Sequence, residues 1–300
     1  MTTAIEVRGL RKSFGQQTVI DGLDLTVDRG EIFALLGPNG AGKTTTINVL
    51  TTLTKPDAGS ATVCGFDVSS AATQVRRRIS LTGQSAAVDD GLSALENLVM
   101  FARLAGLTPS RSRRRAGELL ESFDLRHAAS KRVATFSGGM RRRLDLALSF
   151  VVTPEVLFLD EPTTGLDTRS RRDLWDIIRA LAAEGTTVFL TTQYLEEADQ
   201  LADRIAVLHE GRVAALGTAS ELKARVGGAT VELHDDRGEL LRELPTDGTV
   251  SGLRQALDQL DEQGASGKVT LRRPTLDDVF LTVTTSGTPT TDHDLVKELS

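Results

Sequence analysis

Apolar and polar positions alternate along the first three quarters of the chain with two periods, one typical of strands and one of helices. Short apolar or alternating runs predict β-strands at residues 4–7, 18–27, 31–36, 79–82, 156–159 and 187–190. Helices are predicted at residues 45–53, 94–104, 113–123, after Gly139, and at 171–183. This order predicts an α/β fold, with a mostly parallel sheet flanked by helices and a nucleotide at the carboxyl ends of its strands.

The pattern changes after about Ala224. Gly227 and Gly228 interrupt the chain, and strand-like runs at 230–233 and 268–272 flank a helical stretch at 251–263. This predicts a small C-terminal α+β appendage. We therefore expect a first domain over residues 1–224, an accessory domain over 225–283, and a mobile tail over 284–300, rich in Thr, Ser, Asp and Pro.

Residues 37–44 read Gly-Pro-Asn-Gly-Ala-Gly-Lys-Thr and lie between a predicted strand and a predicted helix. The spacing fits the phosphate-binding pattern G-x-x-x-x-G-K-[ST], in which glycines turn successive N–H groups into one hollow. The lysine adds a positive charge for the terminal phosphates, and the final hydroxyl suits Mg²⁺. The predicted nucleotide-binding residues here are Gly37, Pro38, Asn39, Gly40, Ala41, Gly42, Lys43, Thr44 and Thr45, with Thr44 also a ligand of the metal.

Two carboxylates end the apolar run at 156–159. A buried strand ending in Asp160 and Glu161 directs both side chains towards the phosphate loop. Asp160 suits Mg²⁺, and Glu161 suits the role of a general base that polarises an attacking water. The alternative for Asp160-Glu161-Pro162 is a solvated acidic turn.

The composition of the chain argues against several classes of protein. The 300 residues carry a net charge of -6 and a pI near 5.4, which argues against a general nucleic-acid binder. Cys64 is the only cysteine, so an internal disulfide is excluded and a reducing compartment is expected. No run of eighteen apolar residues occurs, and charges at the N-terminus replace the apolar region of a signal peptide. Any membrane role therefore needs a partner.

Three further segments establish a resemblance. Phe136-Ser137-Gly138-Gly139-Met140 precedes the Asp-Glu strand, residues 163–167 (Thr-Thr-Gly-Leu-Asp) follow it, and Gln84 follows the run at 79–82. With them the chain resembles the nucleotide-binding subunits of ABC transporters over about residues 5–222. The resemblance implies a P-loop NTPase fold with an antiparallel β subdomain, ATP and Mg²⁺ as cofactors, and ATP hydrolysis.

The resemblance also implies roles for single residues. Two subunits pack head to tail, so Ser137, Gly138 and Gly139 of one subunit meet the γ-phosphate held by the other, and Asp167 lies across that contact. Gln84 reaches Mg²⁺ or the lytic water. Phe14 stacks on adenine, although a core phenylalanine is the alternative for this residue.

Gln193 departs from the family pattern, which has histidine on the loop that senses the γ-phosphate. A glutamine can donate a hydrogen bond but cannot become cationic or shuttle a proton. We expect binding to survive, hydrolysis to depend on Glu161 and run slowly, and residue 193 to contribute no pH dependence. Met140 replaces the usual glutamine, with weaker dimer closure as the largest expected effect.

Residues 192–199 (Thr-Gln-Tyr-Leu-Glu-Glu-Ala-Asp) and 274–281 (Pro-Thr-Leu-Asp-Asp-Val-Phe-Leu) resemble ATPase subunits of the daunorubicin-resistance type. The resemblance implies a homodimer beneath integral membrane permease subunits, at the cytoplasmic face of the membrane, exporting a hydrophobic antibiotic. Leu276, Val279, Phe280 and Leu281 either pack within their own small domain or contact another subunit. The alternatives are a soluble ABC ATPase acting on nucleic acid or ribosomes, and a nucleotide-dependent regulator with low turnover.

Arginine clusters at 76–78, 111–115 and 141–143 have two interpretations. They form solvated helix faces, or they face nucleic acid or anionic lipid. The cluster at 141–143, beside the Ser-Gly-Gly segment, is also a candidate for attracting nucleotide phosphates. We expect no nucleic-acid partner.

Overall fold

The computed structural model describes residues 2–83, 88–262 and 267–285. The chain forms two compact units, of which one ends at Ala214 and the other begins at Ala215. Among the helices of the described segments, none has the length and apolar character needed to cross a membrane.

The first unit contains an antiparallel sheet with the strand order β2-β1-β4-β5. Its strands are β1 (Thr3–Phe14), β2 (Gln17–Asp28), β4 (Ala58–Val63) and β5 (Phe66–Asp67). Leu23, Leu25 and Val27 are buried and alternate with outward-facing polar residues, as expected of a strand with one covered face. Gly15 takes a φ of 61° in the turn between β1 and β2, a conformation that glycine adopts without strain.

The second sheet has six strands in the order β10-β9-β3-β8-β7-β6, and the boundary between the units falls within its edge strand β10. They are β3 (Ile32–Leu36), β6 (Ile79–Thr82), β7 (Val156–Asp160), β8 (Thr187–Thr192), β9 (Arg204–His209) and β10 (Arg212–Gly217). β3 runs parallel to β8 and β9, and β7 runs parallel to β6 and β8. Every residue of β3, β7 and β8 is buried, and helices α1, α6 and α7 pack against these strands.

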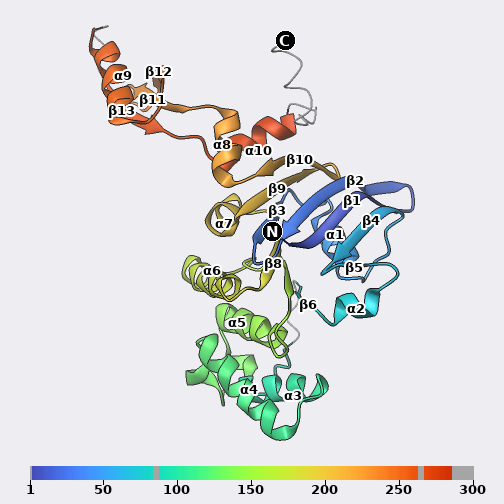
Figure 1. Cartoon of the computed structure of the whole chain (residues 1–300). Helices are drawn as coiled ribbons and strands as arrows, with labels where there is room; N and C mark the ends of the chain where they lie inside the picture. The colour runs from blue at the N-terminus through green and yellow to red at the C-terminus, as the bar shows by residue number, and fades with distance from the viewer. Residues whose placement is uncertain (1, 84–87, 263–266, 286–300) are drawn as a thin grey trace. The chain divides into compact units, whose positions relative to one another are not determined.

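Helices cover this sheet and form a separate group at one end of the unit, where α3, α4 and α5 lie together (Figure 1). Ser93 caps α3 through a capping box with Glu96, and Asp167 caps α6 through the N–H of Ser170. The helices are α1 (Lys43–Leu50), α2 (Ala72–Arg76), α3 (Ala94–Leu104), α4 (Pro109–Ser122), α5 (Gly138–Ser149), α6 (Thr168–Ala183) and α7 (Leu195–Leu201), with 3₁₀ turns at Arg126–Ala128 and Val133–Thr135.

The predicted fold class is confirmed: a mostly parallel sheet flanked by helices, an antiparallel sheet, and a small α+β unit after them. Several boundaries differ from the prediction. β8 continues through Thr192 instead of ending at residue 190, and α6 begins at Thr168 instead of residue 171, because Asp167 supplies its cap. Strands β4, β5, β9 and β10 were not predicted from the sequence pattern.

The second unit combines a three-stranded sheet with helices. Strands β11 (Ala229–His234), β12 (Leu240–Thr246) and β13 (Lys268–Arg272) pair antiparallel in the order β12-β11-β13. Helix α9 (Val250–Glu262) completes a small core with this sheet, made of Val231, Leu233, Ala256 and Leu260. The division of the chain at residue 224 stays a prediction, and residues 286–300 of the predicted tail lie outside the described residues.

Two further helices of this unit, α8 (Ala219–Val226) and α10 (Leu276–Thr285), pack against each other. Leu276 and Val279 are buried, which matches the interpretation that these side chains pack within their own domain. Leu281 is 60% exposed and does not.

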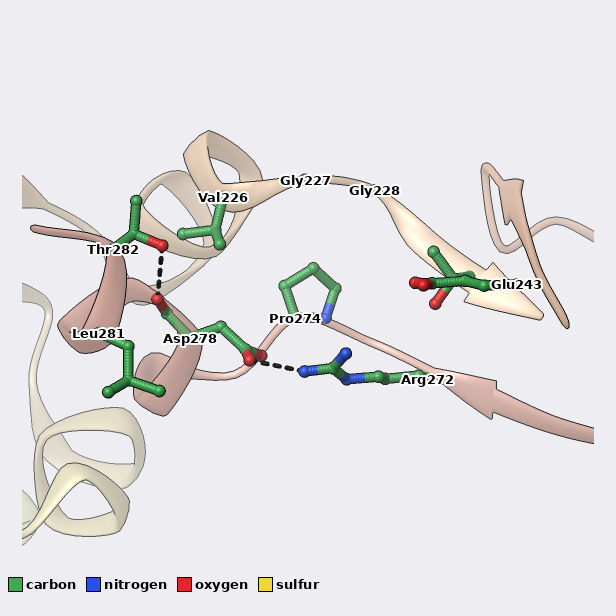
Figure 2. Close-up of a pocket in the computed structure, with 10 residues that line it drawn as sticks. Val226, Gly227, Gly228, Glu243, Arg272, Pro274, Asp278, Leu281 and Thr282 are labelled. Atoms are coloured by element: carbon green, nitrogen blue, oxygen red, sulfur yellow. Dashed lines mark hydrogen bonds and ion pairs between the residues drawn. The ribbon is translucent and has the colours of Figure 1, made fainter. Parts of the chain in front are cut away.

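A pocket of about 380 Å³ lies within the second unit (Figure 2). Its polar groups include Glu243 and the ion pair between Arg272 and Asp278, whose Nη2 and Oδ1 atoms are 2.7 Å apart. That arginine and the N–H and hydroxyl group of Thr275 hold the pKa of Asp278 below its usual value, the hydrogen bonds from Thr275 having the larger effect. None of the predicted nucleotide-binding residues lines this pocket.

Candidate functional site

The phosphate loop connects the buried strand β3 to α1 and has no room for larger residues at two of its glycines. A Cβ at Gly37 would lie 2.5 Å from the carbonyl oxygen of Leu208, and one at Gly42 would lie 2.8 Å from that of Val19. Gly42, the N-cap of α1, also has a φ of 107°. The loop is therefore packed closely against β9 and β2, which carry Leu208 and Val19. The N-terminus of α1 is directed at the space where a phosphate would bind.

Lys43 is the one cation of this loop, and its side chain is only 4% exposed. Its Nζ donates to the carbonyl oxygens of Gly37 and Pro38, at 2.8 and 3.1 Å, and lies 3.5 Å from Glu161 Oε1. A phosphate arriving at the loop would exchange these carbonyl contacts for phosphate oxygens, at which the full charge is better compensated.

Thr44 and Asp160 lie together at the end of β7. The Thr44 hydroxyl donates to the two carboxylate oxygens of Asp160, at 3.0 and 3.3 Å, and Asp160 is 5% exposed. This excludes the alternative of a solvated acidic turn for Asp160. A hydroxyl and a carboxylate beside a phosphate loop fit Mg²⁺, which is commonly held by one or two carboxylates together with substrate phosphates. Within the described residues no cluster of three or more His, Cys, Asp or Glu could hold a metal by itself.

Glu161 follows Asp160 and adopts a left-handed backbone with a φ of 49°, uncommon for a residue with a side chain. Its N–H donates to both the carbonyl oxygen and the hydroxyl of Thr191, at 3.1 and 3.2 Å. Oε1 faces Lys43, and Oε2 accepts a hydrogen bond from the Thr164 hydroxyl at 3.3 Å. The carboxylate therefore lies beside the lysine that would bind the terminal phosphates.

Gln193 is half-buried and follows β8, at the same edge of the sheet as Asp160 and the phosphate loop. The preceding residue connects the two loops, because the carbonyl oxygen of Thr192 accepts from the N–H of Gly37 at 3.2 Å. The predicted metal and water ligand Gln84 lies outside the described residues.

Phe14 ends β1 and is 53% exposed, so it is not the core phenylalanine of the alternative interpretation. The Lys12 ammonium lies 5.3 Å from the ring centroid, within the range of a cation–π contact. An exposed ring of this kind is free to stack on a planar base.

Ser137, Gly138 and Gly139 open α5. The Ser137 hydroxyl accepts a hydrogen bond from the N–H of Met140 at 3.2 Å, and Ser137 and Gly138 are exposed. Gly139 faces α6, where a Cβ would lie 2.5 Å from Ser170 Oγ. The exposed start of the helix leaves backbone N–H groups available to an anion.

Asp167 serves its own chain as the cap of α6. Its carboxylate accepts from the N–H of Ser170 at 2.9 Å and from the Ser170 hydroxyl at 2.7 Å. These hydrogen bonds hold the pKa of Asp167 below its usual value. The predicted role of Asp167 in a dimer contact stays a prediction.

Arg142 is a largely buried arginine of the cluster at 141–143, for which the sequence left open a solvated helix face or a role in attracting nucleotide phosphates. Its side chain is 11% exposed and donates to the carbonyl oxygens of Pro162 and Gly83, at 2.8 and 2.7 Å, and to Asp145 at 3.3 Å. Arg141 and Arg143 pair with Asp90 and Asp124. The cluster at 141–143 is therefore engaged within its own chain, and burial lowers the pKa of Arg142 without removing its charge.

The structure thus brings most of the predicted residues of the first unit to one region. The phosphate loop, Asp160, Glu161 and the Gln193 loop meet at the carboxyl ends of β3, β7 and β8. A cavity of about 270 Å³ lies between the start of α5 and Glu161, lined by Gly138, Arg141, Arg142, Glu161, Thr164, Gly165 and Leu166.

Sequence reasoning missed the role of Thr191 and the burial of Arg142. Thr191 is fully buried in β8 and donates to Asp160 Oδ1. A hydroxyl residue inside an otherwise apolar run, just before Gln193, was the available signal. For Arg142 the sequence offers no signal, because its burial depends on contacts with Gly83 and Pro162, distant along the chain.

Comparison with known proteins identifies the family. The family model described as ABC transporter matches residues 20–164. The chain is 58% identical to the daunorubicin/doxorubicin resistance ATP-binding protein DrrA of Streptomyces peucetius, over 78% of this chain and 72% of that protein. It is 51% identical to the daunorubicin resistance ATP-binding protein DrrA3 of Streptomyces coeruleorubidus, over 94% of this chain and 96% of that protein.

Solved structures agree with the sequence comparisons. An ATP-binding subunit of an ABC transporter has 31% sequence identity and a TM-score of 0.65, over 74% of this chain and 93% of that one. The chain belongs to the ABC transporter family, as an ATP-binding subunit that hydrolyses ATP.

Proposed function

We propose that this chain is the ATPase subunit of an exporter that expels a hydrophobic antibiotic through a separate membrane subunit, from the cytoplasmic face of the membrane. The observation that carries the proposal is the 51% identity to a daunorubicin resistance ATP-binding protein over nearly the whole of both chains. The chain itself offers no membrane-crossing helix among its described residues, so the path for the cargo would belong to the partner.

The geometry of the site supports a separate role for each group of residues. The phosphate loop and Lys43 would bind the β- and γ-phosphates, and Thr44 and Asp160, with Gln84, would hold Mg²⁺. The metal, when bound, neutralises charge that develops on the phosphate oxygens. Glu161 would orient and deprotonate the attacking water, and Phe14 would stack on the adenine ring.

A single copy would supply only part of each reaction centre. Ser137, Gly138 and Gly139 would close on the γ-phosphate held by a second copy, with Asp167 at the contact between them. ATP would then join the two copies and its hydrolysis would release them. The exposed helix start of α5 supports this proposal, because its N–H groups are open to an anion from outside the chain.

Gln193 bears on the rate of this ATPase. Its amide can donate a hydrogen bond to the γ-phosphate but cannot accept a proton near neutral pH. We expect slow turnover that depends on Glu161 and shows no titration from residue 193. Gln193→His should introduce pH dependence between about pH 5 and 8, and Glu161→Gln should abolish turnover while leaving ATP binding intact. Unchanged hydrolysis in Glu161→Gln would refute the assignment of the base.

Transport decides between the export function and its alternatives. The chain and its membrane partner are reconstituted into vesicles, and ATP-dependent movement of daunorubicin, which is fluorescent, is followed with wild-type chain and with the Glu161→Gln variant as control. The proposal requires movement with the wild type and none with the variant. Association with ribosomes or DNA, with no binding to the membrane partner, would favour the soluble ATPase instead.

A further inference from the structure

Thr191 connects the two acidic residues of the site. In the parallel pairing of β7 and β8, Thr191 lies directly opposite Asp160, so both side chains project from the same face of the sheet. The Thr191 hydroxyl donates to Asp160 Oδ1 and accepts from the N–H of Glu161. Thr191 is 0% exposed, so these bonds are shielded from bulk solvent.

Two hydroxyls therefore orient the carboxylate of Asp160, those of Thr44 and Thr191, and only the first is a proposed metal ligand. Thr44 donates to it at 3.0 Å, but this hydroxyl is also the one that Mg²⁺ would take as a ligand. When the Thr44 oxygen turns to a metal, the hydrogen bond from Thr191 is the one that remains to fix the carboxylate. A hydroxyl that can donate to one oxygen leaves the other oxygen, Oδ2, available to the metal.

Thr191 also holds the backbone of Glu161. The N–H of Glu161 is shared between the carbonyl oxygen and the hydroxyl of Thr191, and Glu161 has the strained φ of 49°. A left-handed conformation at a residue with a side chain persists when the surroundings determine it, and these hydrogen bonds are part of those surroundings.

We propose that Thr191 is a positioning residue of the ATPase site, which orients Asp160 towards Mg²⁺ and Glu161 towards the attacking water without touching the nucleotide. The inference rests on the proposed magnesium site at Thr44 and Asp160. It predicts that Thr191 acts on metal-dependent nucleotide binding and leaves metal-free binding at the phosphate loop unchanged.

The test compares nucleotide binding with and without the metal. The dissociation constant of a fluorescent ATP analogue is measured for the full chain in saturating Mg²⁺ and in excess EDTA, at a temperature where turnover is negligible. In Thr191→Val, a change of similar volume that replaces the hydroxyl with a methyl group, the constant in Mg²⁺ should rise about 10- to 100-fold, the usual effect of losing an outer-shell partner of a metal ligand. The constant in EDTA should stay within twofold of wild type.

Three further variants separate this role from a general packing role. Thr191→Ser keeps the hydroxyl and should restore the wild-type constant in Mg²⁺, whereas Thr191→Ala should match Thr191→Val. Thr187→Val is the matched control, since Thr187 is a buried threonine at the opposite end of β8, where it accepts from the N–H of Gly30. It should leave both constants unchanged.

The outcomes distinguish the proposed role of Thr191 from the proposed magnesium site at Thr44 and Asp160. If Mg²⁺ fails to tighten binding even in wild type, the magnesium site is wrong. If Mg²⁺ tightens binding equally in wild type and Thr191→Val, the magnesium site stands and the role of Thr191 is refuted. An equal weakening in Mg²⁺ and EDTA would also overturn the inference, because a packing defect affects both conditions alike.

Discussion

Replacing Gly139 with alanine measures how closely α5 and α6 approach at the Ser-Gly-Gly segment. The new Cβ would lie 2.5 Å from Ser170 Oγ and 2.8 Å from Ser170 Cβ. The hydroxyl can rotate away, but the Cβ is fixed to the backbone of α6, so the helices must move apart. Overpacking of this kind destabilises a fold by roughly 1–3 kcal/mol, and the better helix propensity of alanine offsets up to about 1 kcal/mol. We expect a net loss of about 1–2 kcal/mol in the free energy of unfolding.

Trp175 makes the measurement specific. It is the only tryptophan of the chain, lies on α6 and is 4% exposed, so its fluorescence reports unfolding of the region that contains the contact. In urea denaturation, Gly139→Ala should lower the midpoint and leave the slope of the transition unchanged.

Two control variants test the physical reason. A Cβ at Gly138 meets only Leu166 Cδ2, at 3.7 Å, so Gly138→Ala should be neutral or slightly stabilising. Ser170→Gly removes both clashing atoms at its own cost of about 1 kcal/mol. In the S170G background the clash is gone and only the propensity gain remains, so Gly139→Ala should no longer destabilise, which gives a coupling of about 1–3 kcal/mol in a double-mutant cycle. Equal destabilisation in both backgrounds would refute the steric explanation.

Three further outcomes are expected. Phe14→Ala should weaken binding of an adenine nucleotide by about 1–3 kcal/mol, while Phe14→Tyr retains the affinity; equilibrium titration checks both. Burial raises the pKa of Cys64 to about 11, so iodoacetamide at pH 8 should alkylate the native thiol about 100-fold more slowly than in urea. Burial also raises the pKa of Glu197, so its charged form opposes folding, and this contribution to stability falls as the pH rises through that raised pKa. Glu197→Gln keeps an oxygen that accepts from Trp175 Nε1, so its denaturation midpoint should no longer fall over this pH range. A pH profile identical to that of the wild type would contradict the role of Glu197.

The phosphate loop and the two carboxylates at the end of β7 were predictable, because their residue types and spacing can be read from adjacent positions in the sequence. The phosphate loop needs glycines at fixed spacing, and Asp160 and Glu161 directly follow an apolar run that predicts a buried strand. Local sequence therefore places these residues at the same edge of a parallel sheet before any contact is known.

The remaining parts depend on contacts that the sequence does not display. The pairing of Thr191 with Asp160 follows from the order of strands in the sheet, since β7 and β8 become neighbours only after folding. The cap of α6 was missed for another reason: Asp167 was assigned to an intersubunit contact, and the sequence interpretation did not consider it as the N-cap of its own helix. Strand β12 was missed because five of its seven residues are exposed and give no apolar face.

The contacts of the Arg142 guanidinium determine which substitutions this part of the sequence can accept. At Gly83 and Pro162 its partners are carbonyl oxygens, which every amino acid carries, so replacement of those two residues leaves the acceptors in place. Arg142 itself cannot be replaced in the same way. A lysine lacks the planar guanidinium whose N–H groups donate to three acceptors in different directions. Homologous chains that keep this contact should therefore retain arginine at position 142 even where the residues opposite it have diverged.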